Sequence, residues 1–379
     1  MTDMTMPPSS PAPAHKPGEH PDLPPPLLVA GPIAWLRRNL FSSITNTILT
    51  LLAGYVLYLV IPPIIDWAFI NANWVQGDSR DVCVLPGACW TMIDARFSQF
   101  IYGFYPVDQR WRVDLVFVVF AIAVAGILVE RIPGKRYWAL FLFIAFPVLT
   151  YELLVGGHVF PQVPTDKWGG LMLTLVIAIV GIVFSIPLGV LLALGRQSKL
   201  PVVHLLSVLV IEFVRGVPLI TILFMANVML PLFLPKGVTF DILLRILIGV
   251  TLFSAAYIAE VVRGGLQAMP KGQYEGAQAM GLGYWQMMRL VILPQALRIS
   301  IPGIVNSSIG LFMDTTLVAI VGLYDFLNII KASTKDQNWL GLSMEGYVFA
   351  AVVYWVFCFG MSRYSMHLEA KLHTGHKKR

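Results

Sequence analysis

Long apolar runs dominate the chain. Eight stretches of about 20 residues or more contain almost no charged residue, which is the length that an α-helix needs to cross the hydrocarbon of a bilayer. Because lipid offers the backbone no hydrogen-bond partner, such runs are expected to be α-helices. The pattern predicts an all-α integral membrane protein with about eight transmembrane helices, at 43–69, 113–130, 137–155, 169–195, 203–233, 241–263, 298–323 and 346–364.

Composition agrees with this prediction and also indicates on which side of the membrane each loop lies. Hydrophobic residues make up 57% of the chain and charged residues only 13%, against roughly 25% in a soluble domain. The net charge is +6, and the excess of Lys and Arg lies in short loops and at the C-terminus, which indicates membrane topology rather than nucleic-acid binding. Each helix reverses the side, so the positive-inside rule places both termini in the cytoplasm. The cytoplasmic segments expected are 131–136, 196–199, 264–297 and 371–379.

The opposite side, the periplasm, receives the other connections, which are 70–112, 156–168, 234–240 and 324–345. The first of these contains four arginines and is not long, so it fits the positive-inside rule least well. It either contacts another protein or is a structural insertion, and the sequence leaves both readings open. Tryptophans near the ends of the apolar runs on this side suit interfacial anchors.

The chain divides into four parts. Ten prolines among the first 32 residues favour a disordered tail, which we place at 1–36. An extension of three helices follows at 37–160 and includes the periplasmic loop 70–112. A core of five helices is expected at 161–368, with a long cytoplasmic loop at 264–297, and a basic tail at 369–379.

Cysteine usage is sparse. Cys83 and Cys89 are separated by five residues in the loop 70–112, without the further ligands that a zinc site needs. A disulfide between them is possible if the loop faces the oxidising periplasm. Cys358 lies in an apolar run and suits a small packing residue.

Motifs for bond chemistry are absent. No phosphate-binding loop of the type G-x-x-x-x-G-K-[ST] occurs, so the chain itself is not expected to hydrolyse ATP. Only His158 and His204 lie in the body of the protein, too few for a metal centre. We therefore expect no metal, no cofactor and no enzymatic activity in this chain.

The cytoplasmic segment 264–297 is the most informative. Good helix formers run from Lys271 to Met280, Gly281 and Gly283 then permit a sharp turn, and a second helical run is expected to end at Leu293 and Pro294. The segment would offer apolar side chains and one carboxylate to a soluble partner: Tyr274, Glu275, Ala277, Met280, Tyr284 and Trp285. The alternative is an amphipathic connector that lies on the lipid headgroups.

The spacing within this segment resembles a known motif. Glu275, Gly276 and Ala277 are followed after three residues by Gly281, and after nine more by Val291–Pro294. This resembles the EAA loop of importer permeases of the ATP-binding-cassette (ABC) superfamily, over about twenty positions. Gly276 stands where Ala is usual and Val291 where Ile is usual, both small apolar exchanges.

The resemblance implies a type I importer permease in which this loop docks into a cleft of a separate ATPase. The residues it assigns to coupling are Glu275, Gly276, Ala277, Gly281, Leu293 and Pro294. It also implies a bacterial inner-membrane location and a set of partners. These are two ABC ATPase subunits that bind the ATP and Mg, a second homologous permease subunit, most simply in a heterodimer, a periplasmic amino acid-binding protein, the L-amino acid and membrane lipid.

Flanking segments narrow the resemblance. The segments 211–220, 256–273 and 313–322 look like the polar amino acid permease group, the histidine and glutamine permeases, over about residues 165–368. The three extra helices, the cysteine-bearing loop and the basic end look most like the M-type permease subunit of general L-amino acid importers. That group usually has a lysine before the Asp of the last segment, where this chain has Met313.

Ionisable residues inside apolar runs are costly and are therefore functional candidates, and four qualify here: Glu212, Arg215, Glu260 and Asp314. A broken helix near Pro218 and the pair Glu212 and Arg215 suit a substrate path, and an amino acid could meet Arg215 at one end and Asp314, Thr315 and Thr316 at the other. The alternative is structural: Glu212 and Arg215 pair with each other, Asp314 caps a helix break, and the two threonines bond backbone carbonyls.

Two other classes of function compete with an importer. An ion-coupled secondary amino acid transporter would use the intramembrane carboxylates, but it does not explain the segment 264–297 and no inverted repeat is evident. A membrane-bound enzyme would need a nucleophile and a base at a useful spacing, and none is seen.

Overall fold

A computed structural model describes residues 31–84, 86–129, 131–235 and 240–372, and most of these residues are helical. The predicted tails at 1–36 and 369–379 lie largely outside the described residues. Within them the N-terminal prediction is wrong for its last residues, because helix α1 spans Pro32–Asn39. Proline is well suited to a first helical turn, where its missing N–H has no intrahelical partner in any case.

The membrane-spanning helices confirm the predicted fold class. Among the described residues, seven helices are long and apolar enough to cross a bilayer, and a bent pair raises the number to as many as eight. The seven are Ile44–Ile70, Val107–Leu128, Lys135–Leu154, Gly170–Arg196, Ile242–Gln267, Tyr284–Val321 and Ser343–Lys371, and the bent pair is Pro201–Gly216 with Leu219–Phe233.

The chain forms two units, of which the first is Met1–Ala72. Its main element is α2 (Ile44–Ile65). Ser43 caps the N-terminus of this helix, because its hydroxyl accepts a hydrogen bond from the Asn46 N–H at 3.1 Å. No residue of α2 is buried, and apolar side chains project on all its faces. A helix that is apolar all round suits a lipid environment.

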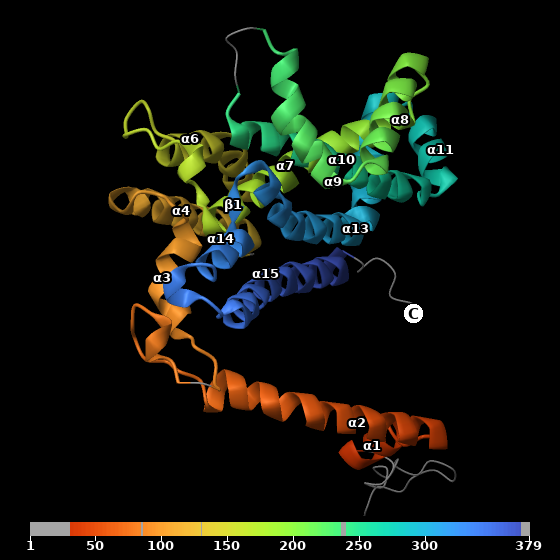
Figure 1. Ribbon diagram of the computed structural model, residues 1–379. Helices are drawn as coiled ribbons and strands as arrows, with labels where there is room; N and C mark the ends of the chain where they lie inside the picture. Colours follow the sequence, from red (N-terminus) through yellow and green to blue (C-terminus); the bar gives the residue numbers. More distant parts are fainter. Residues whose placement is uncertain (1–30, 85, 130, 236–239, 373–379) are drawn as a thin grey trace, which may run out of the picture. The chain divides into compact units, whose positions relative to one another are not determined.

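The second unit is Asn73–Arg379, and its centre is a set of long helices. Helix α10 (Ile242–Gln267) packs along α7 (Gly170–Arg196) and α13 (Leu293–Asp314), and α15 (Ser343–Leu372) packs against α13 (Figure 1). The approach of α7 to α10 is close: a Cβ on Gly189 would lie 2.9 Å from the Ala255 carbonyl oxygen. Small residues at such contacts are the usual means of helix packing in membranes.

Four more helices pack against one another and against this centre. Helix α4 packs against α5 and α6, which form one span through a π-helical turn, and α8 packs against α7 and α10. Their bounds are α4 (Arg110–Leu128), α5 (Lys135–Leu140), α6 (Phe146–Leu154) and α8 (Pro201–Gly216).

The span predicted at 203–233 is broken near Pro218, as expected from the sequence. Helix α8 ends at Gly216, α9 (Leu219–Phe224) begins after Pro218, and the two parts meet at 107°. Proline cannot donate the backbone hydrogen bond that would continue α8, and the residue before it avoids helical backbone angles.

The helix predicted to start at 298 in fact starts earlier. Helix α12 (Tyr284–Met287) passes through a π-helical turn at Met288–Ile292 into α13, so the helical run predicted to end at Leu293 and Pro294 continues through them. A π-helical turn relieves the crowding that the ring of Pro294 would cause in a regular α-helix.

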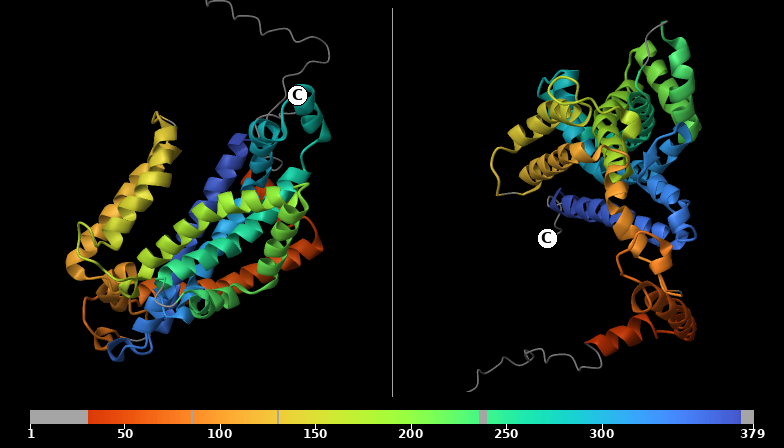
Figure 2. Two further views of the ribbon diagram at one scale, coloured as in Figure 1. Left: turned by 90° about the horizontal axis from the view of Figure 1, so that it is seen from above. Right: turned by 60° about the vertical axis from the view of Figure 1, so that its left-hand side comes forward.

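Short elements lie at opposite ends of this helix set (Figures 1 and 2). At one end is α11 (Lys271–Ala279), and at the other are α3 (Thr91–Tyr102), β1 (Tyr324–Asp325) and α14 (Phe326–Ser333). Strand β1 pairs with the start of the span of α7, through bridges from Tyr324 and Asp325. The hydropathy pattern predicted neither α3 nor α14.

Candidate functional site

The short helix predicted in the segment 264–297 is confirmed. Helix α11 ends one residue before the predicted limit, and the chain then turns through Gly281, whose φ of 73° is a left-handed value that glycine adopts without strain. The Gly281 and Leu282 N–H groups donate to the Gln278 and Ala277 carbonyls at 2.9 and 3.2 Å, so the turn satisfies the end of the helix.

The faces of α11 differ from the prediction in one respect. Glu275 and Gly276 are exposed, as are Met280 and Trp285, at 80% and 72%. Ala277, which we expected to face a partner, is only 5% exposed and lies in a cluster with residues of α10 and α12. The face of α11 that carries Ala277 packs against the protein, so it is not free to contact a partner. Because Ala277 is small, α11 can lie close to the helix set.

Packing ties α11 firmly to the long helices. The cluster joins Ala277 to Leu266 of α10, Met287 of α12 and Ala296 of α13. The Gln295 amide adds a polar link, since its Nε2 donates to the Gln273 side chain at 3.0 Å and to the Val291 carbonyl at 2.9 Å. Tyr274 turns partly inward, and burial raises the pKa of its phenol. These contacts connect α11 to α10, α12 and α13.

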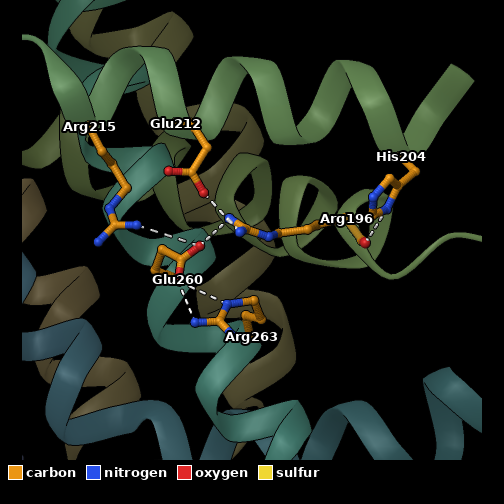
Figure 3. Close-up of polar contacts among 6 residues, drawn as sticks. All are labelled: Arg196, His204, Glu212, Arg215, Glu260 and Arg263. Carbon is orange, nitrogen blue, oxygen red and sulfur yellow. Dashed lines mark hydrogen bonds and ion pairs between the residues drawn. The ribbon is translucent and has the colours of Figure 1, made fainter.

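Glu260 of α10 is the centre of an ionic cluster (Figure 3). Its carboxylate contacts three guanidinium groups: Arg263 at 2.7 Å, Arg215 at 3.6 Å, and Arg196 in a short hydrogen bond. Arg196 also pairs with Glu212 at 2.8 Å. These five residues, Arg196, Glu212, Arg215, Glu260 and Arg263, are called the ionic cluster below.

The ionic cluster joins three helices near one end. Arg196 is the last residue of α7, Glu212 and Arg215 lie on α8, and Glu260 lies seven residues before the end of α10, about 10 Å along the helix axis. The Glu212–Arg215 pair that we considered from their spacing is wrong, because each binds a residue of another helix. The sequence did not bring Arg196 together with Glu260 and Arg263, because Arg196 precedes Glu260 by 64 positions and belongs to another helix.

Asp314 lies at a cavity. A space of about 290 Å³ is lined by polar and apolar residues of α10 and α13, namely Phe253, Ser254, Tyr257, Asn306, Ser307, Gly310, Leu311 and Asp314. Within the described ranges the Asp314 carboxylate has no hydrogen bond or ion pair from another side chain. A carboxylate without a partner at a cavity that also contains polar side chains is suited to bind a cation such as an ammonium group.

The other predicted path residues are placed differently. Arg215 does not line the cavity, but its guanidinium lies 5.6 Å from the ring centre of Tyr257, which does. The Thr315 hydroxyl is buried and donates to the Phe312 carbonyl at 2.8 Å, and Thr316 donates to Met313 at 3.0 Å. Both threonines bond backbone carbonyls, as the structural alternative proposed.

The cysteine-bearing loop folds onto the end of the helix set opposite α11. Cys83 and Cys89 form a disulfide with Cα atoms 5.7 Å apart. Residues of this loop and of α3 pack with α14 and α15 in one cluster that includes Met92, Phe100, Phe326 and Trp339.

Polar contacts reinforce this packing. Arg96 pairs with Asp336 at 2.6 Å, the Arg80 guanidinium donates to the Leu340 carbonyl, and the Cys89 N–H donates to Glu345. The loop 70–112 therefore has, from residue 73 onward, the contacts of a structural insertion. Among the described residues, no group of three or more His, Cys, Asp or Glu side chains is arranged to hold a metal ion.

Comparisons with known proteins agree with this architecture. Residues 185–374 match the family described as binding-protein-dependent transport system inner membrane component. The chain is 52% identical to an Escherichia coli protein named inner membrane amino-acid ABC transporter permease protein YhdY, over 90% of this chain and 94% of the relative.

A second relative and a solved structure are also similar. The relative is the glutamate/glutamine/aspartate/asparagine transport system permease protein BztC of Rhodobacter capsulatus, 43% identical over 93% of this chain and 96% of its own length. The structure is described as a crystal structure of an amino acid ABC transporter with histidines, at 27% identity and a TM-score of 0.46, over 53% of this chain and 92% of that one. From the family match and the extent of these identities, the chain belongs to the family of binding-protein-dependent transport system inner membrane components and is a multi-pass membrane permease subunit of the ABC transporter type.

Proposed function

We propose that this permease subunit forms part of the translocation path of an ATP-driven importer for L-amino acids in a bacterial inner membrane. The observation that carries the proposal is the 52% identity over nearly the whole length of a relative named as an amino-acid ABC transporter permease. The chain performs no bond chemistry in this proposal. A separate pair of ATPase subunits binds ATP and Mg and hydrolyses the ATP, and a binding protein delivers the amino acid from the periplasm.

The proposed topology follows the basic residues. The end with α11 and the ionic cluster faces the cytoplasm, together with both termini, and the end with the disulfide faces the periplasm. In support, these two sets of elements lie at opposite ends of the second unit (Figure 2). A second, homologous permease subunit completes the path across the membrane.

Coupling is proposed to run through α11. The exposed face with Glu275, Gly276, Met280 and Trp285 docks into the ATPase, and Gly281 maintains the turn behind it. Because Ala277 packs against α10 and α12, movement of the docked helix is passed to α10 and to Glu260 in the ionic cluster. The ionic cluster then transmits it to α7 and α8.

The amino acid is proposed to bind at the cavity beside Asp314. Its ammonium group pairs with the Asp314 carboxylate, and its carboxylate is attracted to Arg215, which stacks on the cavity residue Tyr257. Thr315 and Thr316 act in this proposal through the backbone, since their hydroxyls are already bonded to carbonyls.

The docking proposal is tested by disulfide crosslinking in the assembled importer. A cysteine at Gly276, which is exposed, is expected to crosslink to cysteines in the ATPase cleft and to block uptake. A cysteine at the neighbouring Ala277, which is 5% exposed, is the matched control and is expected to crosslink far less. Equal crosslinking at both positions, or uptake that survives ATP depletion, would refute the proposal, and the latter would favour an ion-coupled carrier.

The substrate site is tested with Asp314→Asn, which keeps the shape of the side chain and removes its charge. Loss of one charge-assisted hydrogen bond is expected to reduce uptake about tenfold or more, since such bonds contribute about 1.5–3 kcal/mol. The matched control combines Asp314→Asn with Asn306→Asp, which places a carboxylate elsewhere in the same cavity. This double variant is expected not to regain uptake, because the carboxylate is at the wrong position. Normal uptake by Asp314→Asn, with assembly unchanged, would eliminate this site.

A further inference from the structure

A buried carboxylate lies beside the end of the helix that bears Asp314. Asp325 is 0% exposed and begins α14. Its oxygens accept hydrogen bonds from the Leu327 and Asn328 N–H groups and from the Tyr354 hydroxyl, all at 3.2 Å, and from the Asn328 amide in a short bond. Burial raises the pKa of Asp325, and these hydrogen bonds act in the opposite direction by stabilising the carboxylate. Within the described residues no cation pairs with it.

Asn328 connects Asp325 to the turn that follows α13. Its Nδ2 donates both to Asp325 and to the backbone carbonyl of Thr316, at 3.0 Å in the latter case. An amide group that bonds a buried carboxylate on one side and a carbonyl on the other has little rotational freedom. Asn328 therefore links the first turn of α14 to the turn that contains Thr316.

That turn follows the cavity directly. Asp314 is the last residue of α13, and a 3-10 turn begins at Thr315. The Thr316 carbonyl held by Asn328 is two residues from the Asp314 carboxyl group. A shift of the turn would rotate the end of α13 and with it the direction of the Asp314 side chain relative to the cavity.

We infer that Asn328, held in place by Asp325, is a positioning residue that sets the direction of the Asp314 carboxylate at the cavity. The inference rests on the proposed binding of substrate at Asp314 and adds to it a residue that does not line the cavity. It also gives the buried Asp325 a role, since a carboxylate accepts more hydrogen bonds than a neutral amide at the same place.

The test uses the complete importer reconstituted in proteoliposomes, with its ATPase, its partner permease and saturating amino acid-loaded binding protein. Uptake and ATP hydrolysis are measured together, and their ratio gives the amino acids moved per ATP. For Asn328→Ala we expect this ratio to fall about fivefold to tenfold, as for the loss of one well-placed hydrogen bond. ATP hydrolysis itself is expected to stay near the wild-type rate, whereas a merely structural defect would lower both rates in proportion.

Two further variants make the test specific. Asn328→Leu has a similar size but no donor for the Thr316 carbonyl and adds no charge beside Asp325, so it is expected to behave like Asn328→Ala even if the alanine variant assembles poorly. Asn338→Ala is the matched control, because Asn338 is exposed and its side chain has no hydrogen bond in the described part of the chain. It is expected to leave the ratio unchanged.

A double variant separates this inference from the proposed function. If Asn328 acts through Asp314, then Asn328→Ala adds no further loss in the Asp314→Asn background. An additional loss there, or a wild-type ratio for both Asn328 variants while Asp314→Asn is impaired, would overturn the positioning role alone. Unimpaired transport by Asp314→Asn would instead refute the substrate site on which the inference rests.

Discussion

At the scale of single residues, Glu260 has the highest concentration of charged contacts in the described part of the chain. Its side chain is 14% exposed and contacts three guanidinium groups from α7, α8 and α10. Without this carboxylate, three partly buried guanidinium groups would lie together with only Glu212 to balance them. Glu212, by contrast, has a side chain that is 56% exposed and one arginine partner.

Glu260→Gln is therefore expected to destabilise the protein by about 2 kcal/mol, less than for a fully buried pair, since it leaves three partly buried guanidinium groups near one another. Glu212→Gln, which makes the same chemical change at a more exposed position, is expected to cost less than about 1 kcal/mol. The midpoints of thermal unfolding in detergent give the comparison. Equal midpoints for the two variants would contradict the central place of Glu260.

At the scale of elements, the turn behind α11 depends on one glycine. Gly281 has a positive φ, whereas Gly276 lies within α11 with open space around the position of a Cβ. Gly276 and Gly281 are therefore expected to respond to the same substitution in opposite ways. The backbone angle decides the sign at Gly281, and helix propensity decides it at Gly276.

Gly281→Ala is expected to strain the turn by about 1–2 kcal/mol and to displace α11, with a clear loss of ATP-dependent uptake. Gly276→Ala is expected to stabilise α11 by up to about 1 kcal/mol, with uptake retained. Uptake by the two variants in whole cells, at matched protein levels in the membrane, is the measurement. The turn has no role in coupling if Gly281→Ala transports at the rate of the parent protein.

At the scale of the whole molecule, residues 73–112 are attached to the C-terminal helices. The disulfide, the Arg96–Asp336 pair and the shared apolar cluster fasten them to α14 and α15. Asn328 of α14 bonds the turn after Asp314, so these contacts also support the position of α14 next to the proposed substrate site.

Replacing Cys83 and Cys89 together by serine is expected to lower the free energy of unfolding by about 2 kcal/mol, the value for a small closed loop. Cys358→Ala is the control, since that cysteine is free, and it is expected to leave the sensitivity to reductant unchanged. Thermal midpoints with and without dithiothreitol test both expectations. An identical midpoint for parent and double variant in oxidising buffer would show that the bond is not formed.

The sequence by itself determined the class of fold and the position of the short helix and turn in the segment 264–297. Apolar runs must become helices in lipid whatever their neighbours, and glycine, proline and helix formers act over a few residues, so the spans, the break near Pro218 and the turn at Gly281 could be predicted locally. The proposed roles of Glu275 and Gly276 rest on the same local spacing.

Only the tertiary structure decided which distant residues meet. Glu212 and Arg215 lie three positions apart, yet each pairs across to another helix, because packing angles and not sequence spacing place their side chains. The inward turn of Ala277, the cavity at Asp314 and the link from Asp325 through Asn328 to Thr316 have the same origin. These contacts depend on how helices approach one another, and the pattern of apolar residues along a single helix does not contain that information.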